Sequence, residues 1–543
     1  MYIVTVDEMR EIEARAEREY GLTSATLMKN AGESAAAILL ETQELQYTPS
    51  LAGKHFLFLI GPGNNGGDGH IMAQVLGKLG ARVSLYRWKE QQLLLEGKEI
   101  PATETATRLQ ECIEMADYII DALLGTGRSR LLPENMRDLL HTVQQERQKR
   151  EDGLIVALDL PTGMNADTGE VDPGTIPADM TITLAYPKQG MFFFPGRKYL
   201  GQLAVGDIGL PATMQHNLHA QMITAEMVQA ALPPRPLDSN KGTFGKVMLL
   251  CGSPPYPGSA YLAGNAAGRI GAGLVTLAVT EKMLPIYASA FHEATFVLLP
   301  EESENSFALV KTLAEHLEGY RALLIGPGLG QSTYIREAIL EILENLRSLP
   351  DEKRPHLLVD ADGLNNLSAL ERWWTLLPPE TVITPHPGEM GRLCHGLKVS
   401  GGNIDRLELA RQKAKEWNVT LVLKGACTII AKPDEDIRIN WQANPALATA
   451  GTGDVLAGMI SGLLAQKVEP FDAASTAVYL HVAASELVSR EIGDTGLLAA
   501  DLLKQIPRAI LEMKEEEELA RYIEEDDTGN KIEGDQLNTS QPG

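Results

Sequence analysis

Short apolar runs alternate with helical patterns along this 543-residue chain, and this alternation is the feature that most constrains its fold. The pattern is typical of parallel strands joined by crossover helices. It therefore predicts an α/β fold, with strands in the first half at 55–60, 81–88, 118–122, 154–158 and 180–185.

The alternation stops around residues 210–236, where the sequence contains prolines and mixed polarity, and then starts again. The second set of predicted strands lies at 246–251, 274–279, 322–325, 356–360, 381–384 and 420–424. We therefore predict two domains, 1–217 and 218–514. The acidic residues 515–543 follow, and we expect them to be disordered. Helical spacing predicts an amphipathic surface helix over 7–20, another over 27–40 and a last one over 497–514.

The net charge of -24, from 48 basic and 72 acidic residues, argues against nucleic acid or an anionic membrane as the main partner. The four cysteines show no metal-ligand spacing, which favours free thiols in a reducing compartment. The first residues lack a signal-peptide pattern, and no apolar run reaches the roughly 18 residues of a membrane span. We expect a cytoplasmic protein with small-molecule ligands.

One glycine-rich turn, Gly451-Thr452-Gly453-Asp454, opens into an apolar helical pattern. Small residues let backbone N–H groups face an anion, and the positive end of the helix dipole favours that anion. The carboxylate of Asp454 would repel a phosphate, so it is better placed to take a proton from an attacking hydroxyl. This arrangement favours phosphoryl transfer to an alcohol.

The first half has a different glycine-rich loop, residues 61–69, between a predicted strand and a helix. It contains the GxGxxG pattern of dinucleotide sites, but Pro62 and Asp68 depart from an ordinary dinucleotide loop. Asp121 and Asp159 each follow another strand. Because ligands bind beyond the carboxyl ends of parallel strands, we expect Asn65, Asp121 and Asp159 to meet in one cleft.

These patterns leave alternatives open. The glycines could form tight turns, and each aspartate could cap a helix. The second half could be a small-molecule kinase of the vitamin or sugar class fused to an NAD-sensing domain, in which case a stable phosphorylated product would form. The first half could also be a ligand-sensing or scaffolding module, although a scaffold has no need of Asp121, Asp159 and the Asn65 loop.

Segments 27–32, 61–69, 121–127 and 159–163 resemble the NAD(P)H-hydrate epimerases, which interconvert the R and S forms of hydrated NADH and NADPH. The resemblance implies a Rossmann-like three-layer α/β/α domain, an acid/base function for Asp159, and a potassium ion held by Asn65, Asp121 and Thr162. This sequence has Lys29, Arg128 and Thr162 where the family usually has Glu, an apolar residue and Ser. Lys188 is either a phosphate ligand or a surface lysine. The implied hydrate contacts are Asn64, Asn65, Gly66, Gly67, Asp68, Gly125, Thr126, Gly127, Arg128, Ser129, Arg130, Leu131 and Asp159.

Segments 240–246, 252–260, 326–330, 360–362, 384–389, 424–428 and 451–454 resemble the ribokinase-like ADP/ATP-dependent NAD(P)H-hydrate dehydratases. The resemblance implies a ribokinase-like α/β domain that uses Mg²⁺ with ADP. Asn240 stands where that family often has His. The implied hydrate site is Ala260, Gly328, His386 and Asp454, and the implied nucleotide site is Lys424, Gly425, Ala426, Cys427, Thr428 and Gly453.

Together, the two resemblances predict a bifunctional enzyme of nicotinamide-nucleotide repair. The first domain would epimerise the hydrate. The second would phosphorylate the hydroxyl of the S form from ADP and expel phosphate, which gives NAD(P)H and AMP. We expect a homo-oligomer without nucleic-acid or membrane partners. The residues alone do not decide between ADP and ATP, between NADH hydrate and NADPH hydrate, or whether substrate is channelled.

Overall fold

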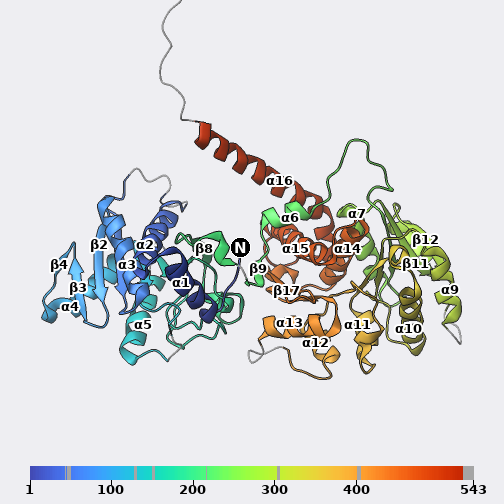
Figure 1. Ribbon diagram of the computed structural model, residues 1–543, viewed down its shortest axis with the longest axis horizontal. Helices are drawn as coiled ribbons and strands as arrows, with labels where there is room; N and C mark the ends of the chain where they lie inside the picture. Colours follow the sequence, from blue (N-terminus) through green and yellow to red (C-terminus); the bar gives the residue numbers. More distant parts are fainter. Residues whose placement is uncertain are drawn as a thin grey trace, which may run out of the picture. The chain divides into compact units, whose positions relative to one another are not determined.

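The computed structural model describes residues 1–42, 45, 50–127, 131–149, 153–215, 217–301, 306–399 and 405–529, with side chains up to residue 515. The chain divides into two compact units, Met1–Met222 and Ile223–Gly543. This division falls a few residues after the 217/218 boundary predicted from the sequence. Figure 1 shows both units as helices packed around a sheet.

The first unit contains an eight-stranded sheet in the order β4-β3-β2-β1-β5-β6-β7-β8. Strands β1, β2 and β5–β8 pair in parallel, whereas β3 and β4 pair antiparallel at one edge. The strands are β1 (His55–Ile60), β2 (Arg82–Arg87), β3 (Gln92–Leu95), β4 (Lys98–Glu99), β5 (Tyr118–Ala122), β6 (Leu154–Leu158), β7 (Met180–Leu184) and β8 (Gln202–Gly206). β9 (Ala220–Met222) ends this unit in the chain.

Helices cover both faces of this sheet, because successive side chains of each strand point to opposite faces. Phe56 and Phe58 pack with residues of α1–α3, whereas Leu57 and Leu59 pack with residues of α4 and α5. The helices are α1 (Val6–Tyr20), α2 (Ser24–Leu40), α3 (Asn64–Lys78), α4 (Ala102–Met115) and α5 (Glu134–Gln148). The three-layer α/β/α architecture predicted for this half is confirmed.

The residues at the two ends of α1 determine where this helix begins and ends. The Thr5 side chain accepts from the backbone N–H of Glu8, and the Glu8 side chain accepts from the N–H of Thr5, so two helix-start donors are satisfied reciprocally. Gly21, with φ +67°, ends the helix in the left-handed region that glycine tolerates. Met9, Ile12 and Ala16 are buried, which leaves the Arg10 and Glu13 side of the helix free to face a ligand.

The second unit contains a sheet whose strands follow the order β12-β11-β10-β13-β14-β15-β16-β17-β18. Strands β10–β16 pair in parallel, and β17 and β18 add an antiparallel pair. The strands are β10 (Lys246–Leu250), β11 (Leu274–Thr280), β12 (Thr295–Leu299), β13 (Ala322–Ile325), β14 (His356–Val359), β15 (Val382–Ile383), β16 (Thr420–Leu423), β17 (Thr428–Ala431) and β18 (Ile437–Asn440).

The most apolar helix of this unit, α14, packs between the sheet and neighbouring helices, and almost all its residues are buried. In Figure 1, α14 and α15 lie on one side of the strands, and α11 and α13 lie on the other. The helices are α6 (Ala225–Ala231), α7 (Pro257–Arg269), α8 (Leu284–Ala290), α9 (Phe307–His316), α10 (Thr333–Ser348), α11 (Asp362–Ser368), α12 (Pro387–Leu393), α13 (Arg406–Trp417), α14 (Thr452–Ala465), α15 (Pro470–Ile492) and α16 (Ala499–Gly529). This unit is an α/β domain, as predicted.

The end of α16 differs from the sequence prediction. We expected disorder from residue 515 onward, but the backbone is helical to Gly529. Residues 515–529 include six Glu, and Glu is a good helix former, so helix propensity outweighs the repulsion between the acidic groups. Residues 530–543 of the predicted tail lie outside the described residues. Among the helices described, none has the length and apolar character needed to cross a membrane.

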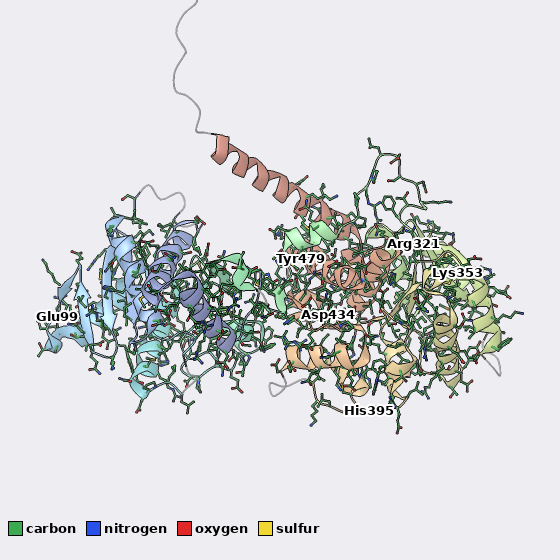
Figure 2. The ribbon with its side chains drawn as sticks, viewed as in Figure 1. Glu99, Arg321, Lys353, His395, Asp434 and Tyr479 are labelled. Carbon is green, nitrogen blue, oxygen red and sulfur yellow. The ribbon has the colours of Figure 1, made fainter. Side chains whose placement is uncertain are left out.

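Several strands were absent from our sequence prediction, namely β3, β4, β8, β9, β12, β17 and β18. Most are short, and β4 lies at a sheet edge where both its residues are exposed. The side chain of Glu99 on β4 lies at the rim of the first unit in Figure 2. A charged edge strand has few buried apolar residues, so its sequence lacks the apolar run by which the inner strands are recognised. Its charges also discourage pairing of the sheet edge with another chain.

Candidate active sites

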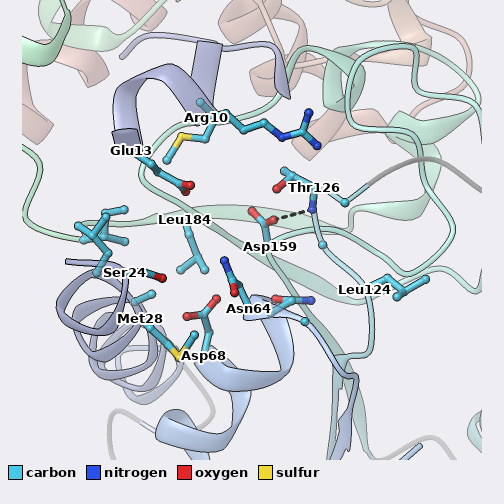
Figure 3. Close-up of a pocket in the computed structure, with 18 of the residues that line it drawn as sticks. Arg10, Glu13, Ser24, Met28, Asn64, Asp68, Leu124, Thr126, Asp159 and Leu184 are labelled. Atoms are coloured by element: carbon cyan, nitrogen blue, oxygen red, sulfur yellow. Dashed lines mark hydrogen bonds between the residues drawn. The ribbon is translucent and has the colours of Figure 1, made fainter. Parts of the chain in front are cut away.

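A cavity of about 590 Å³ opens at the carboxyl ends of β1, β5 and β6 in the first unit (Figure 3). In the sheet, β1 lies between β2 and β5. The chain continues from β1 to β2 on one side of β1 and later enters β5 on its other side, so the loops that follow β1 and β5 run in opposite directions away from this point. The lining residues are Met9, Arg10, Glu13, Ala14, Glu17, Leu22, Ser24, Leu27, Met28, Ala31, Gly63, Asn64, Asn65, Asp68, Leu123, Leu124, Gly125, Thr126, Gly127, Asp159, Gly163, Met164, Leu184, Lys188 and Ile208.

Glycines allow the loop after β1 to pack directly against backbone. A Cβ on Gly61 would lie 1.7 Å from the carbonyl oxygen of Leu123, and one on Gly66 would lie 2.0 Å from the carbonyl oxygen of Gly61. Neither position accepts a side chain without moving the backbone. The glycines therefore bring the N-terminus of α3, with Asn64 and Asn65, to the cavity.

Asp159 lies at the centre of this site, directly after β6, with φ +65°. Its Oδ1 accepts from Lys188 Nζ at 2.5 Å and from Thr183 Oγ1 at 3.4 Å. Its Oδ2 accepts from the backbone N–H of Thr126 at 3.3 Å, and Figure 3 shows this bond. A non-glycine residue in the left-handed region is strained, which is common where a loop positions a functional side chain.

Lys188 is not a surface lysine, so that sequence alternative is wrong. The residue is 1% exposed, and its Nζ donates to Asp159 Oδ1, to Thr183 Oγ1 at 3.0 Å and to the carbonyl oxygen of Leu184 at 2.9 Å. An ammonium group has three donors, and all three are used. The sequence could not reveal this pair, because 29 residues separate the partners.

Behind the cavity, Asp121 and Thr162 form a buried polar pair. Thr162 Oγ1 donates to Asp121 Oδ1 at 2.7 Å, and the N–H of Thr162 donates to Oδ2 at 2.9 Å. Asn65 is 7% exposed, and neither polar atom of its side chain has a hydrogen-bond partner among the described residues. Asn65 and Asp159 line the cavity, whereas Asp121 does not, so the predicted single cleft holds two of the three residues.

Two further carboxyl groups of the cavity lining, those of Asp68 and Glu13, have a raised pKa. Burial, Asp159 and Glu13 raise the pKa of Asp68 to about 8, against a smaller opposing effect of Lys188. Partial burial raises the pKa of Glu13, which Lys188 opposes and Asp159 supports. Glu13 and Arg10 come from α1, which the sequence indicated only as a surface helix; its charged residues gave no sign that they face a cavity.

The remaining predicted contacts of this half have different positions. Gly66 and Gly67 support the loop rather than line the cavity, and Leu131 is exposed and lies outside the lining. Asn64, Gly125, Thr126 and Gly127 line the cavity. The predicted contacts Arg128, Ser129 and Arg130 lie outside the described residues.

The second unit has a similar junction between the loops after β10 and β13. The N–H of Gly252 donates to the carbonyl oxygen of Pro327 at 2.7 Å, and Ser253 Oγ donates to that of Gly328 at 2.6 Å. Gly328 has φ +66°, and a Cβ there would lie 2.8 Å from Ser259 Oγ. Ala260, next in α7, is fully buried. The loops thus bring predicted hydrate-site positions Ala260 and Gly328 together.

Asp454 lies in the first turn of α14, after Gly451, whose φ is +91°. Burial and Asp360 raise the pKa of Asp454 to about 6, although Ser259 and Lys424 favour its charged form. A carboxyl group with this pKa is mostly ionised at neutral pH and is more basic than an ordinary aspartate. It therefore suits proton abstraction near neutral pH.

Lys424, directly after β16, belongs to the predicted nucleotide site and interacts electrostatically with Asp454. Its Nζ lies 2.8 Å from Asp360 Oδ1 and 3.9 Å from Glu389 Oε2. Burial alone would lower the pKa of Lys424, but Asp360 and Glu389 outweigh burial and raise it. A Cβ on Gly453 would lie 3.6 Å from Lys424 Nζ, so the loop before Asp454 passes close to the ammonium group.

The other predicted residues of this half surround the same loops. His386 caps α12, where its Nδ1 accepts from the N–H of Gly388 at 2.9 Å, and burial and Lys424 lower its pKa. Gly425 packs against the Arg406 guanidinium, since a Cβ there would lie 2.6 Å from Nη2. Thr428 Oγ1 donates to the carbonyl oxygen of Gly425 at 3.0 Å. Gly425 and Ala426 are exposed, and Cys427 is buried.

The four cysteines, Cys112, Cys251, Cys394 and Cys427, form no disulfide with one another. Burial raises the pKa of Cys112 and Cys394, which keeps these thiols protonated. In the described ranges, no group of three or more His, Cys, Asp or Glu residues could hold a metal ion.

Comparison with known proteins agrees with this division. Residues 24–190 match the family model described as YjeF-related protein N-terminus, and residues 247–508 match that of NAD(P)H-hydrate dehydratase. A crystal structure of the ADP/ATP-dependent NAD(P)H-hydrate dehydratase from Bacillus subtilis is 35% identical and covers 54% of this chain and 98% of that protein, with a TM-score of 0.47.

Two full-length relatives are similar to both halves at once. The bifunctional NAD(P)H-hydrate repair enzyme of Moorella thermoacetica is 35% identical, and the alignment covers 95% of this chain and 98% of that protein. The Escherichia coli enzyme of the same name is 33% identical and covers 93% of each chain. The chain therefore belongs to the family of bifunctional NAD(P)H-hydrate repair enzymes.

Proposed function

We propose that the first unit epimerises hydrated NADH and NADPH in the cavity at Asp159. In this proposal, the second unit dehydrates the S form at the Asp454 loop, with ADP as phosphoryl donor and AMP and phosphate as products. The observation that carries the proposal is the buried Lys188–Asp159 pair facing a cavity of about 590 Å³, a volume suited to a small-molecule ligand.

The chemistry of the hydrate explains why the first unit needs acid/base groups. Water adds to an enamine double bond at the carbon next to nitrogen, because the nitrogen lone pair stabilises positive charge there. The hydroxyl-bearing carbon of the hydrate is therefore bonded to the ring nitrogen. Its configuration changes only when a bond at this carbon breaks and re-forms, and both events require proton transfer. Asp159, whose Oδ1 accepts from the Lys188 ammonium, can accept such a proton.

In the second unit, the substrate hydroxyl must lose its proton as it attacks the terminal phosphoryl group. Asp454 is the base in this proposal, and the N–H groups at the start of α14 stabilise charge on the phosphoryl oxygens. Lys424, Gly425, Ala426, Cys427, Thr428 and Gly453 would hold the nucleotide, and Ala260, Gly328 and His386 would complete the hydrate site. Mg²⁺ would enter with ADP and neutralise phosphate charge.

One assay tests the whole proposal. Mixed hydrate epimers are incubated with the protein and Mg²⁺, with and without ADP, while the absorbance of the reduced nicotinamide is followed. We expect absorbance to return for both epimers, and only when ADP is present. A stable phosphorylated product without restored absorbance would contradict the proposal and favour a small-molecule kinase.

A potassium ion fits the polar residues beside the first cavity. Asn65 has a buried side-chain oxygen without a partner, and Thr162 and Asp121 offer further oxygens, which are the ligands that hard cations prefer. Asn65, Asp121 and Thr162 would hold the ion, whose charge would favour an anionic ligand nearby.

We therefore expect replacement of K⁺ by tetramethylammonium to weaken hydrate binding by the first unit about tenfold, or about 1.4 kcal/mol. The Asn65→Leu variant serves as control, because its affinity should no longer respond to the cation. Titration of the hydrate in both buffers measures the effect. Equal affinity and equal epimerisation in K⁺-free buffer would remove the ion from the proposal.

A further inference from the structure

Two aspartates of the first cavity, Asp68 and Asp159, have opposite electrostatic surroundings. Both line the cavity and both are 7% exposed. Asp159 comes from the end of β6, whereas Asp68 comes from α3 on another side of the ligand space (Figure 3). Their different neighbours determine which of them carries a proton.

Asp159 has the only ammonium group that reaches into this part of the described cavity. Lys188 Nζ donates to its Oδ1, and the N–H of Thr126 donates to its Oδ2. These contacts favour the charged form. Thr126 uses one lone pair of Oδ2, so a second lone pair of this atom is available to a ligand.

Asp68 has the opposite environment. None of the ion pairs between described residues includes it, and no described side chain donates a hydrogen bond to it. From α1 it faces the carboxyl of Glu13, with Arg10 and Glu17 also on the cavity wall. The facing residues of α2 are uncharged, among them Leu27 and Met28. Burial and the nearby negative charges raise the pKa of Asp68 to about 8, so the carboxyl keeps its proton at neutral pH.

We propose that Asp68 is a second catalytic residue of epimerisation, the acid that acts together with Asp159 as base. This inference rests on the proposed function of the first unit. Two carboxyl groups in different protonation states around one ligand are the arrangement that acid/base chemistry at a single carbon requires.

The proposed step begins with the Asp68 carboxyl, which donates its proton to the substrate hydroxyl as the C–O bond breaks. The bonding electron pair leaves with the oxygen as water, and the nitrogen lone pair forms a C=N bond. Water then adds to the opposite face of the carbon, the C=N pair returns to nitrogen, and Asp159 takes the released proton. In net terms, one proton has moved from Asp68 to Asp159. Exchange with solvent restores the starting protonation of both groups, or Asp159 acts as the acid and Asp68 as the base in the reverse reaction.

The test compares Asp68→Asn with the full-length wild-type protein, using one purified hydrate epimer and chromatographic separation of the two forms. Asparagine keeps the size and the neutral charge of the protonated carboxyl but cannot donate an acidic proton. We expect kcat for epimerisation to fall about 10²-fold or more, with KM within about threefold. Asp68→Glu should retain part of the activity.

The pH profile distinguishes catalysis from structure. In the wild type, kcat should fall as the pH rises above about 8, because Asp68 then loses its proton. Asp68→Asn should lack this alkaline decrease. Dehydration of the S hydrate by the same preparations shows that the chain is folded, and the exposed Asp138→Asn on α5 is the matched control without effect.

A kcat for Asp68→Asn within threefold of the wild type, or an unchanged alkaline decrease, would overturn the function of Asp68 as acid. If Asp159→Asn remains inactive in that experiment, the proposed function of the first unit stands and only this inference fails. If the wild-type protein epimerises no hydrate at all, both fail together.

Discussion

Replacing Asp454 by asparagine is expected to lower the rate of ADP-dependent dehydration by at least about 10²-fold, since a positioned general base contributes about 10²–10⁴-fold. The substitution keeps the size of the side chain and removes its basicity. Nucleotide affinity should change little, because the backbone N–H groups at the start of α14 and the ammonium of Lys424 remain. Return of reduced-nicotinamide absorbance from the S hydrate measures the effect.

The wild-type rate should also fall as the pH decreases below about 6, because Asp454 then takes up a proton and can no longer accept one. The exposed Glu337→Gln on α10 is the matched control and should behave as the wild type. Epimerisation by Asp454→Asn should be normal. A fully active Asp454→Asn enzyme would show that this carboxylate only stabilises the start of the helix and that another group is the base.

Replacing Asp159 by asparagine is expected to reduce epimerisation by about 10²–10⁴-fold while the S hydrate is still dehydrated at the normal rate. The reason is that the two reactions take place in separate units, each with its own glycine-rich loops and carboxylates. Interconversion of purified epimers and ADP-dependent dehydration are measured on the same preparation.

The Asp159→Asn change also leaves the buried ammonium of Lys188 without its carboxylate, which destabilises a protein by about 3–5 kcal/mol. The double variant Asp159→Asn/Lys188→Met removes this unpaired charge and is the matched control for folding. Both variants should be inactive in epimerisation and active in dehydration. If the double variant is stable and still epimerises the hydrate, Asp159 is not the base. Loss of both activities in a folded single variant would contradict the assignment of two separate sites.

Much of the fold could be predicted from the sequence because the inner strands are continuous apolar runs. β1, β5, β6 and β13 have the predicted bounds, and β7, β10 and β14 differ by a single residue at one end. Several missed strands, such as β17 and β18, are only four residues long, and β4 is an exposed pair of charged residues, so none of these three presents a long apolar run. The end of α16 was missed because acidic composition indicates disorder even where helix propensity is high.

The sequence by itself determined which loops carry chemistry. Gly61, Gly66 and Gly328 lie where a Cβ would meet backbone or neighbouring side chains, so glycine is a local requirement that is visible in the residue type. Asp159 comes directly after a predicted strand, and Asp454 comes directly after the glycines of its turn. Their positions in the sequence therefore place Asp159 at a strand end and Asp454 in the first turn of a helix. A motif records the glycine itself, although the group that a Cβ would meet can be distant in the chain, as Leu123 is from Gly61.

Only the tertiary structure decided the electrostatic surroundings of the carboxyl groups. Asp68, Asp159 and Asp454 have the same side chain, yet Asp159 pairs with Lys188, burial among acidic groups raises the pKa of Asp68 to about 8, and Asp454 has a pKa of about 6. Lys188 and the charged residues of α1 reach the cavity from distant parts of the chain. Protonation depends on burial and on the distances between charges, and these quantities exist only once the chain has folded.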